Sequence, residues 1–557
     1  MLYPQKNLKR ELECMDGLWD FKIGDDIRQI AVPASWNEQY NDLFDYFGKA
    51  EYSKKIFIPE YYKDKAVYLR FGSVASKAEV FANGESVCYH EGTALPFECK
   101  IDTYLKFGSE NLISVIVDNS LDPWALPPAV LHNNEGRVGF FNSYPPVTYD
   151  FFPYGGIQRS VYVYTTSPVS IKNIKIDTDI NGDVDFSVIF SDKVTGCLNA
   201  YIENKSVNIE IDSADNAKGR IKIENPRLWD IGKPELYDLK LELFKDDELI
   251  DTYVQNFGIR KIEIVDNSLL LNNRKIFLKG FGKHEDFHII GKGFNNAVMV
   301  KDFSLLKWIG ANSFRTSHYP YDEQILSYAD QNGILVIGET PFVGLNERMY
   351  TESILDKANG IIREMIDRDY NHPSVIMWSL ANEPNAESDE AELFFKSMYE
   401  TARDKDKSRP ITYVAHLEPK NNRGMKYYDL ICINKYYGWY LAPGQIDNTL
   451  DELSDCLDLF HIESGKGVIV AEFGADAIAG MHTDPPQMFS EEYQTEIIKK
   501  QYEVIKSKDY VMGAHVWAFA EFKTAQSISR IILNRKGVFT RDRQPKMAAH
   551  MLKKLWE

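Results

Sequence analysis

From about residue 270 onward, short apolar runs typical of buried strands alternate with segments of helical periodicity. The periodicity is clear in ILDKANGIIREMIDRDY (354–370), where apolar residues at i, i+3 and i+4 spacing form one stripe. Eight strand candidates fall at residues 275–282, 311–317, 334–340, 375–384, 411–416, 430–437, 467–475 and 511–522. Eight strand-plus-helix units in about 290 residues predict a (β/α)8 TIM barrel.

The chain before the barrel has the two-residue alternation of antiparallel strands. Residues 1–165 contain apolar runs such as AVYLRFG and NLISVIVDN, separated by Gly, Asn, Asp and Pro turn signals. A second series of six or seven short strands follows over about residues 167–260, which suits an immunoglobulin-like sandwich. We predict three domains: a β-sandwich at 1–165, an immunoglobulin-like β-sandwich at 166–262 and a catalytic TIM barrel at 263–557.

The charge of the chain restricts its partners. With 64 Lys and Arg against 82 Asp and Glu, the net charge is −18, which opposes binding to nucleic acid or to an anionic membrane. An acidic substrate would need positive charge gathered at its own site. No stretch approaches the roughly 18 apolar residues of a membrane span, and the N-terminus lacks the apolar region of a signal peptide. We therefore expect a cytoplasmic protein that binds neither nucleic acid nor membrane.

The cysteines do not have the spacing of a metal site. The six lie at positions 14, 88, 99, 197, 432 and 456, without a CxxC pair, and no His cluster has zinc spacing. This pattern predicts buried free thiols. We expect no metal and no organic cofactor.

In a TIM barrel the active site lies at the C-terminal ends of the strands. Here the strand ends are rich in carboxylates, amides and aromatic residues, whereas the strand starts are mostly Val, Ile and Leu. The strand-end residues are Arg315 to His318, Glu339, Asn382 to Pro384, Asn434 to Tyr437, Glu472 and Trp517. Two glutamates on one rim suggest a retaining glycosidase, whose two carboxyl groups stand about 5–5.5 Å apart. One must stay protonated and the other ionised, so their environments must differ.

The chain resembles glycoside hydrolase family two, and within it the microbial β-glucuronidases. The similar motifs are DFFPYGGI (150–157), RTSHYPY (315–321), NHPSVIMWSLANEP (371–384), NKYYGWY (434–440), AEFGAD (471–476) and NRKGVFTRDRQPK (534–546). The resemblance spans the whole chain and implies a jelly-roll fold for the first sandwich, with a homotetramer as the assembly. It also implies that Glu383 is the general acid/base and Glu472 the nucleophile. Asn382 would hydrogen-bond the sugar 2-hydroxyl.

Further residues are expected to contact the substrate by the same resemblance. Asp150 would reach over the barrel mouth to sugar hydroxyls, His318 would also meet hydroxyls, and Tyr436 would interact with the nucleophile. Structural alternatives stay open for three of these positions. Asp150 could be a turn carboxylate, His318 a core histidine, and Trp439 with Tyr440 a pair that only packs. The other residues expected in the pocket are Asn434, Tyr440, Trp517 and Arg530.

Residues 533–539 read LNRKGVF, a composition that is routine in a hairpin turn. This stretch follows the eighth strand and so lies on the face of the two glutamates. In the β-glucuronidases that the chain resembles, the Asn-x-Lys pair binds the C6 carboxylate of the sugar. Lys536 is therefore expected as the charge partner and Asn534 as an amide donor, with Arg535 turned to solvent.

The loop after the third strand, PFVGLNERMYTES, has only about a dozen residues. Some relatives carry a long loop there that covers the active site. The short loop predicts an open mouth, or one covered by another element, and favours larger or oligomeric substrates over small drug-like ones.

The expected function is hydrolysis of small-molecule or oligosaccharide β-D-glucuronides through a covalent glycosyl-enzyme. A β-galactosidase or β-galacturonidase with the same chemistry stays open. A neutral sugar would leave the Lys536 ammonium without an anionic partner, which is costly in a buried site, whereas a galacturonide keeps the carboxylate. A non-catalytic carbohydrate-binding protein is the third alternative, although it would be expected to lose one of the two glutamates.

Overall fold

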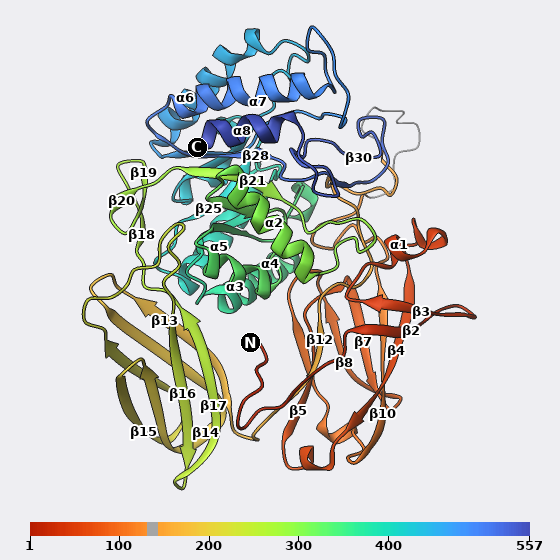
Figure 1. Ribbon diagram of the computed structural model, residues 1–557, viewed down its shortest axis with the longest axis vertical. Coiled ribbons are helices and arrows are strands. Elements are labelled where there is room, and N and C mark those ends of the chain that lie inside the picture. The colour runs from red at the N-terminus through yellow and green to blue at the C-terminus, as the bar shows by residue number, and fades with distance from the viewer. Residues whose placement is uncertain (131–142) are drawn as a thin grey trace.

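The computed structural model describes residues 1–130 and 143–557 (Figure 1). Two β-rich regions occupy opposite sides of the lower half of the view, and the barrel with its helices fills the upper half. The N-terminus lies between the two β-rich regions. There Gln5 donates to the carbonyl of Val254 at 2.7 Å, and Arg10 forms a buried ion pair with Asp251 at 2.6 Å. The first residues of the chain therefore join the two sandwiches.

The first region is a jelly-roll β-sandwich with two main antiparallel sheets. One has the order β1 (Leu12–Cys14), β12 (Val161–Thr166), β5 (Ala66–Phe71) and β9 (Phe97–Lys100). The other has the order β3 (Asp26–Val32), β2 (Gly17–Ile23), β4 (Lys49–Ile58), β10 (Ser109–Asp118), β7 (Lys77–Ala82) and β8 (Glu85–Glu91). Alternate residues Ile113, Val115 and Val117 on β10 are fully buried, which is the period of a strand with one face in a core.

The expectation of six buried free thiols is wrong. Cys88 on β8 and Cys99 on β9 form a disulfide that joins the two sheets, and Cys14 is an exposed thiol. Cys432 and Cys456 are buried free thiols as expected. The pairing was missed because β8 and β9 are edge strands of different sheets, so their side chains meet only when the sandwich closes.

The second region is an immunoglobulin-like β-sandwich. Its strands are β13 (Ile171–Thr178), β14 (Asp183–Ile202), β15 (Lys205–Lys222), β16 (Tyr237–Lys245) and β17 (Glu248–Phe257). β14 is long enough to serve both sheets, because its first half pairs with β13 and its second half with β16. The pairing of β14 with β15 is irregular between the two halves, after Ile189, where a bulge allows a strand to bend.

The third region is a closed barrel of eight parallel strands, which confirms the TIM-barrel prediction. The strands are β21 (Leu278–Lys283), β22 (Ser313–Thr316), β23 (Leu335–Glu339), β24 (Val375–Asn382), β25 (Ile411–Ala415), β26 (Ile431–Asn434), β27 (Val468–Glu472) and β28 (Val511–Trp517). Each lies within, or within one residue of, a predicted strand. The small antiparallel sheet of β18 (Ile262–Val265), β19 (Ser268–Leu271) and β20 (Arg274–Lys275) precedes the barrel, and its Leu269 and Leu271 pack against the strand residues Leu278 and Leu335.

Helices cover the outside of the barrel. They are α2 (Asn296–Ile309), α3 (Glu323–Asn332), α4 (Glu352–Asp369), α5 (Asp389–Lys405), α6 (Leu450–Ser464), α7 (Glu491–Lys506) and α8 (Met547–Trp556). Between β25 and β26 the chain forms only the 3-10 turns η5 (Pro419–Asn421) and η6 (Arg423–Tyr427), where the helical pattern was weakest. Within the described residues, no helix is both long and apolar enough to cross a membrane.

α4 illustrates how the sequence specifies these helices. Thr351 caps its N-terminus by accepting from the backbone N–H of Ile354. The predicted apolar stripe lies on the barrel, with Ile362 and Met365 fully buried. Fully burying such a side chain contributes about 1.5–3 kcal/mol, so the stripe outweighs the cap in holding the helix to the barrel.

Candidate active site

A cavity of about 530 Å³ opens at the C-terminal ends of the barrel strands. Eleven of the twelve residues predicted for the site line it: Asp150, His318, Asn382, Glu383, Asn434, Tyr436, Tyr440, Glu472, Trp517, Arg530 and Lys536. The twelfth, Asn534, is fully buried beside the cavity and donates to Asp150 Oδ2 at 2.8 Å. The fold thus brings together residues that are up to 386 positions apart, since the set runs from Asp150 to Lys536.

Glu472 ends β27 and accepts hydrogen bonds from donors at the ends of two other barrel strands. Arg315 Nη2, at the end of β22, lies 2.5 Å from Oε1, and the Tyr436 hydroxyl donates to Oε2 at 2.6 Å. Burial raises the pKa of Glu472, and the positive charge of Arg315 opposes that shift. The negative charge of Glu383 raises it further, so the two glutamates resist being ionised together.

Glu383 follows the last residue of β24 and has a different environment. Its Oε1 accepts from Asn434 Nδ2 at 2.7 Å, a neutral donor, and no cation is in direct contact with it among the described residues. Burial raises the pKa of Glu383. Its backbone has φ +49°, a left-handed conformation that costs a non-glycine residue about 1–2 kcal/mol. Hydrogen bonds of Glu383 N to Val414 O at 2.8 Å and of Asn382 N to Phe342 O at 2.9 Å hold this conformation.

Below the two glutamates lies a third buried carboxylate, Glu339 at the end of β23. Arg315 Nη1 is 2.8 Å from both of its oxygens, and His318 Nδ1 is 2.7 Å from Oε1. Ser379 donates to Oε2 at 2.7 Å. Although burial alone would raise it, the pKa of Glu339 is lowered by Arg315 and His318. Arg315, which is fully buried, thus bridges Glu339 and Glu472.

The opposite wall of the cavity carries cations that are paired with acids. Lys536 Nζ lies 2.7 Å from Asp476 Oδ2 and 2.7 Å from the Tyr440 hydroxyl. Arg530 Nη2 lies 2.6 Å from Asp150 Oδ2 and donates to the same Tyr440 hydroxyl at 2.6 Å. Although burial alone would raise it, the charges of Lys536 and Arg530 lower the pKa of Asp476. Asp150 belongs to the jelly roll, so this wall joins two domains.

Comparison with known proteins decides the family. The model of the glycosyl hydrolases family 2 TIM barrel domain matches residues 262–557, that of glycosyl hydrolases family 2 matches residues 159–260, and that of the family 2 sugar binding domain matches residues 7–168. The chain belongs to glycoside hydrolase family 2. It is a glycosidase.

Relatives of this family 2 enzyme are similar over its full length. A β-glucuronidase of Paenibacillus borealis is 40% identical, covering 100% of this chain and 98% of the relative. The β-glucuronidase of Homo sapiens is 35% identical, covering 99% of this chain and 92% of the relative. The solved structure of a β-D-glucuronidase of Dictyoglomus thermophilum has a TM-score of 0.93 at 42% identity, covering 100% and 98% of the two chains. That of a Ruminococcus gnavus β-glucuronidase in complex with D-glucaro 1,5-lactone has a TM-score of 0.92 at 34% identity, covering 100% and 99%.

Two expectations about the Asn-x-Lys stretch of the family 2 enzyme are wrong. Lys536 is not without an anionic partner, because Asp476 already neutralises it, so the cost of an unpaired ammonium does not argue against a neutral sugar. Arg535 does not turn to solvent: its side chain is 18% exposed and pairs with Glu521 at 2.9 Å. Both acids lie far from 534–536 in the sequence, and only the packed loops bring them close.

Sequence reasoning also missed the roles of three members of the site. Arg315 and Glu339 stood at strand ends, the same signal that found the other residues, but no role was drawn for them. Asp476 lies inside the AEFGAD motif, four positions after Glu472, without a signal of its own. The partners of these charged groups depend on distances across the barrel, which spacing along the chain does not encode.

The mouth of the cavity is bordered by another domain. Only residues 340–351 separate β23 from α4, and Val343 and Gly344 of this short loop line the cavity. Thr148 and Tyr149 of the jelly roll line it beside them. The jelly roll therefore contributes to the mouth beside the short loop. Residues 131–142 lie outside the described part of the chain.

Proposed function

We propose that this family 2 glycosidase is a retaining β-glucuronidase. The observation that carries the proposal is the cluster of Lys536 and Arg530 on the cavity wall with Asn534 buried beside them, which gathers donors suited to a carboxylate. Relatives at 40% and 35% identity over nearly the whole chain are named β-glucuronidases, which supports the same substrate class. The catalytic assignment of Glu383 and Glu472 and the substrate contacts below are parts of this proposal.

In the first step Glu472 attacks the anomeric carbon while Glu383 gives its proton to the glycosidic oxygen. The bond from the anomeric carbon to the aglycone breaks, and an ester bond from that carbon to Glu472 forms. The environments favour this division, because Arg315 and Tyr436 stabilise the anionic form of Glu472. Glu383 has only the neutral Asn434 donor and therefore keeps a proton more readily.

In the second step a water molecule attacks the glycosyl-enzyme and Glu383 accepts its proton. The ester bond breaks, glucuronic acid leaves and Glu472 returns to the anion held by Arg315. The negative charge on Glu472 raises the proton affinity of Glu383 when the covalent bond is absent, and the bond removes that charge. Glu383 can therefore act first as an acid and then as a base.

Asn382 is oriented to meet the sugar. Its Oδ1 lies 3.4 Å from Arg315 Nη1 and 3.3 Å from Asn434 Nδ2, so both donors direct the amide oxygen away from the substrate. The Asn382 Nδ2 group remains to donate to the 2-hydroxyl, a contact that strengthens as oxocarbenium character develops. Trp517 forms the floor beside it, stacked on His318 with ring centroids 5.0 Å apart.

The carboxylate of the substrate would meet Lys536 and Asn534. An ammonium has three donors, and Lys536 uses two of them on Asp476 and Tyr440, so one remains for the ligand. Asp476 and Asp150 keep Lys536 and Arg530 neutralised in the empty enzyme. A substrate carboxylate therefore joins a network of ion pairs that already exists. Its binding depends on exchanging hydrogen bonds within that network as much as on its attraction to a positive charge.

Hydrolysis of 4-nitrophenyl β-D-glucuronide, compared with the matching galactoside and galacturonide, tests the proposal. We expect kcat/KM to be highest for the glucuronide. A galacturonide preference would transfer the assignment to the 4-epimer, and a galactoside preference would overturn the role of Lys536 and Asn534. Turnover of none of the three by the folded protein would favour a carbohydrate-binding role.

We also infer a homotetramer, no metal or organic cofactor, and a cytoplasmic location from the family resemblance and the composition. Within the described residues no group of three or more His, Cys, Asp or Glu side chains is arranged to hold a metal ion. Sedimentation velocity tests the tetramer, and unchanged activity after dialysis against a chelator tests the independence from metals. A monomer at assay concentration would refute the first inference.

A further inference from the structure

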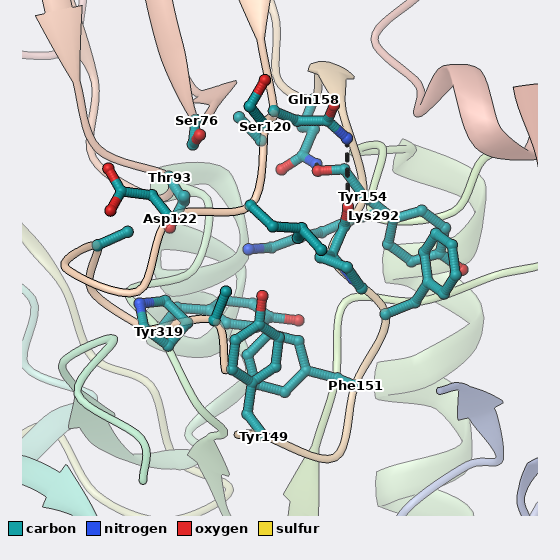
Figure 2. A pocket seen from close by; sticks show the side chains of 18 residues that line it. Ser76, Thr93, Ser120, Asp122, Tyr149, Phe151, Tyr154, Gln158, Lys292 and Tyr319 are labelled. Atoms are coloured by element: carbon teal, nitrogen blue, oxygen red, sulfur yellow. Dashed lines mark hydrogen bonds between the residues drawn. The ribbon is translucent and has the colours of Figure 1, made fainter. Parts of the chain in front are cut away.

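A second cavity, of about 70 Å³, lies between the jelly roll and the barrel (Figure 2). The jelly roll contributes polar residues, among them Thr93, Ser120 and Gln158, and the barrel region contributes Lys292 and Tyr319. A buried water needs about 10–15 Å³ of such volume, so the space accepts several waters or one small ligand. Neither Glu383 nor Glu472 lines it, which makes this cavity distinct from the active site.

Lys292 lies in the middle of this cavity (Figure 2). The residue is 9% exposed, and its Nζ stands 3.3 Å from the centroid of the Tyr319 ring. Within the described residues no carboxylate comes within ion-pair distance of Nζ and no acceptor hydrogen-bonds it. A ring face alone compensates only part of the cost of taking an ammonium out of water.

The acids near Lys292 are committed elsewhere. Glu285 is 2.9 Å from Arg159 and accepts from the backbone N–H of Asp322 at 3.1 Å. Asp122, on the cavity wall, is paired with Lys77 at 3.2 Å. Burial lowers the pKa of Lys292 to about 7, with Glu285 opposing the shift and Arg159 adding to it. Among the described residues, the cation in this cavity therefore has no counter-ion.

The cavity also offers an acceptor and hydroxyl groups. Gln158 is 1% exposed, and its Oε1 has no hydrogen-bond partner among the described residues, while its Nε2 donates to the carbonyl of Tyr154 at 3.3 Å. Thr93 and Ser120, which carry hydroxyl groups, also line the cavity. A ligand with one anionic end and a hydroxyl or bound water beside it would satisfy both Lys292 and Gln158.

We propose that this cavity is a binding site for one small anion, a short carboxylate or an inorganic oxoanion, with the Lys292 ammonium as its charge partner. Charge-assisted hydrogen bonds are the strong ones, and here they form away from competing water. Water alone would hydrogen-bond Nζ without neutralising it. The volume excludes a bulky ligand.

An anion in this cavity would touch the segment that carries Asp150. Tyr149 lines both the second cavity and the active-site cavity, and its ring centroid is 4.3 Å from that of Phe151. Phe151 in turn packs on His284 at 5.2 Å. Asp150, which lies between Tyr149 and Phe151 in the chain, pairs with Arg530. The site is thus placed to stabilise the jelly-roll side of the active-site mouth.

Isothermal titration of the protein with sodium acetate and with sodium sulfate, at constant ionic strength in chloride, tests the proposal. We expect binding of at least one anion by the wild-type protein and an affinity at least about tenfold lower in Lys292→Met. Lys6→Met is the matched control, because it removes the same charge from a side chain that is 70% exposed, and it should bind like wild type. Binding of acetate alone would identify a carboxylate site, and binding of sulfate alone an oxoanion site. Binding of both would identify a site that selects only for negative charge.

The absence of binding to wild type, or equal affinity in Lys292→Met, would overturn the proposal. The pH dependence gives a test that needs no variant. Acetate and sulfate stay ionised from about pH 6 to 9, so the affinity should fall as Lys292 loses its proton above about pH 7. The charged and titratable groups around the cavity are Glu285, Arg159, Asp122, Tyr149, Tyr154 and Tyr319. A pH-independent affinity over this range would refute the role of Lys292.

Discussion

Arg315 binds Glu472 across the floor of the barrel, with Nη2 2.5 Å from Oε1 and both side chains buried. The same guanidinium holds Glu339 with its other nitrogen at 2.8 Å. One cation therefore favours the anionic form of the carboxylate to which the nucleophile role is assigned, and a second buried carboxylate fixes that cation. The predictions below follow from this and related contacts.

Arg315→Lys should lower kcat by at least about tenfold although the charge is kept. A lysine cannot span two carboxylates with a planar fork, so Glu472 loses either its position or its anionic form. Steady-state kinetics on 4-nitrophenyl β-D-glucuronide measures the effect. Arg315→Met should in addition lower the free energy of unfolding by about 3–5 kcal/mol, because it leaves Glu339 buried without its partner. A wild-type kcat in Arg315→Lys would contradict the arrangement.

Glu383 should set the alkaline limb of the pH–rate profile. Burial raises the pKa of Glu383, and the protonated form is the active one in the first step, so kcat/KM should fall as pH rises through that raised value. Glu383→Gln should abolish this limb together with most of the activity. Glu472→Gln should abolish turnover at every pH while circular dichroism shows an intact fold. A full alkaline limb in Glu383→Gln would reassign the acid.

Lys536→Met should lower kcat/KM on the glucuronide by about 30-fold to several thousandfold, which corresponds to 2–5 kcal/mol for truncating a buried hydrogen-bonded charge. Since the single variant leaves Asp476 buried without its cation, the double variant Lys536→Met with Asp476→Asn is the cleaner measurement. Arg535→Met is the matched control, because Arg535 pairs with Glu521 and does not line the cavity. Equal losses on the glucuronide and the galactoside would assign Lys536 a structural role.

Lys292→Met should make the protein more stable near pH 7 in the absence of binding anions. The pKa of Lys292 is lowered to about 7 in the folded state, so between about pH 7 and 10.5 the unfolded chain binds more protons. The loss of folding stability caused by the buried Lys292 charge is complete below the folded-state pKa. It decreases by roughly 1.4 kcal/mol per pH unit until the pH reaches the pKa of the unfolded chain. Urea unfolding of both proteins across this range should show the difference shrinking with pH. A difference that grows with pH would contradict the sign.

Much of the fold could be predicted because its signals are local. The apolar runs of the eight barrel strands and the stripe of α4 depend on residues within a few positions of one another, and burial then follows the period of each element. The same holds for the strand-end positions of Glu383 and Glu472, since parallel strands in a barrel end on one face. The helical pattern in the sequence was also weakest between β25 and β26, where the structure forms only 3-10 turns.

The sequence by itself thus determined the barrel, the face of the active site and most of the residues around it. Only the tertiary structure decided their partners: Arg315 between two glutamates, Asp476 on Lys536, Asp150 on Arg530, and the disulfide of Cys88 and Cys99. The physical reason is that periodicity reports the direction of a side chain relative to a core. An ion pair or a cross-link depends on the distance between two groups on different elements, which meet only after those elements have packed.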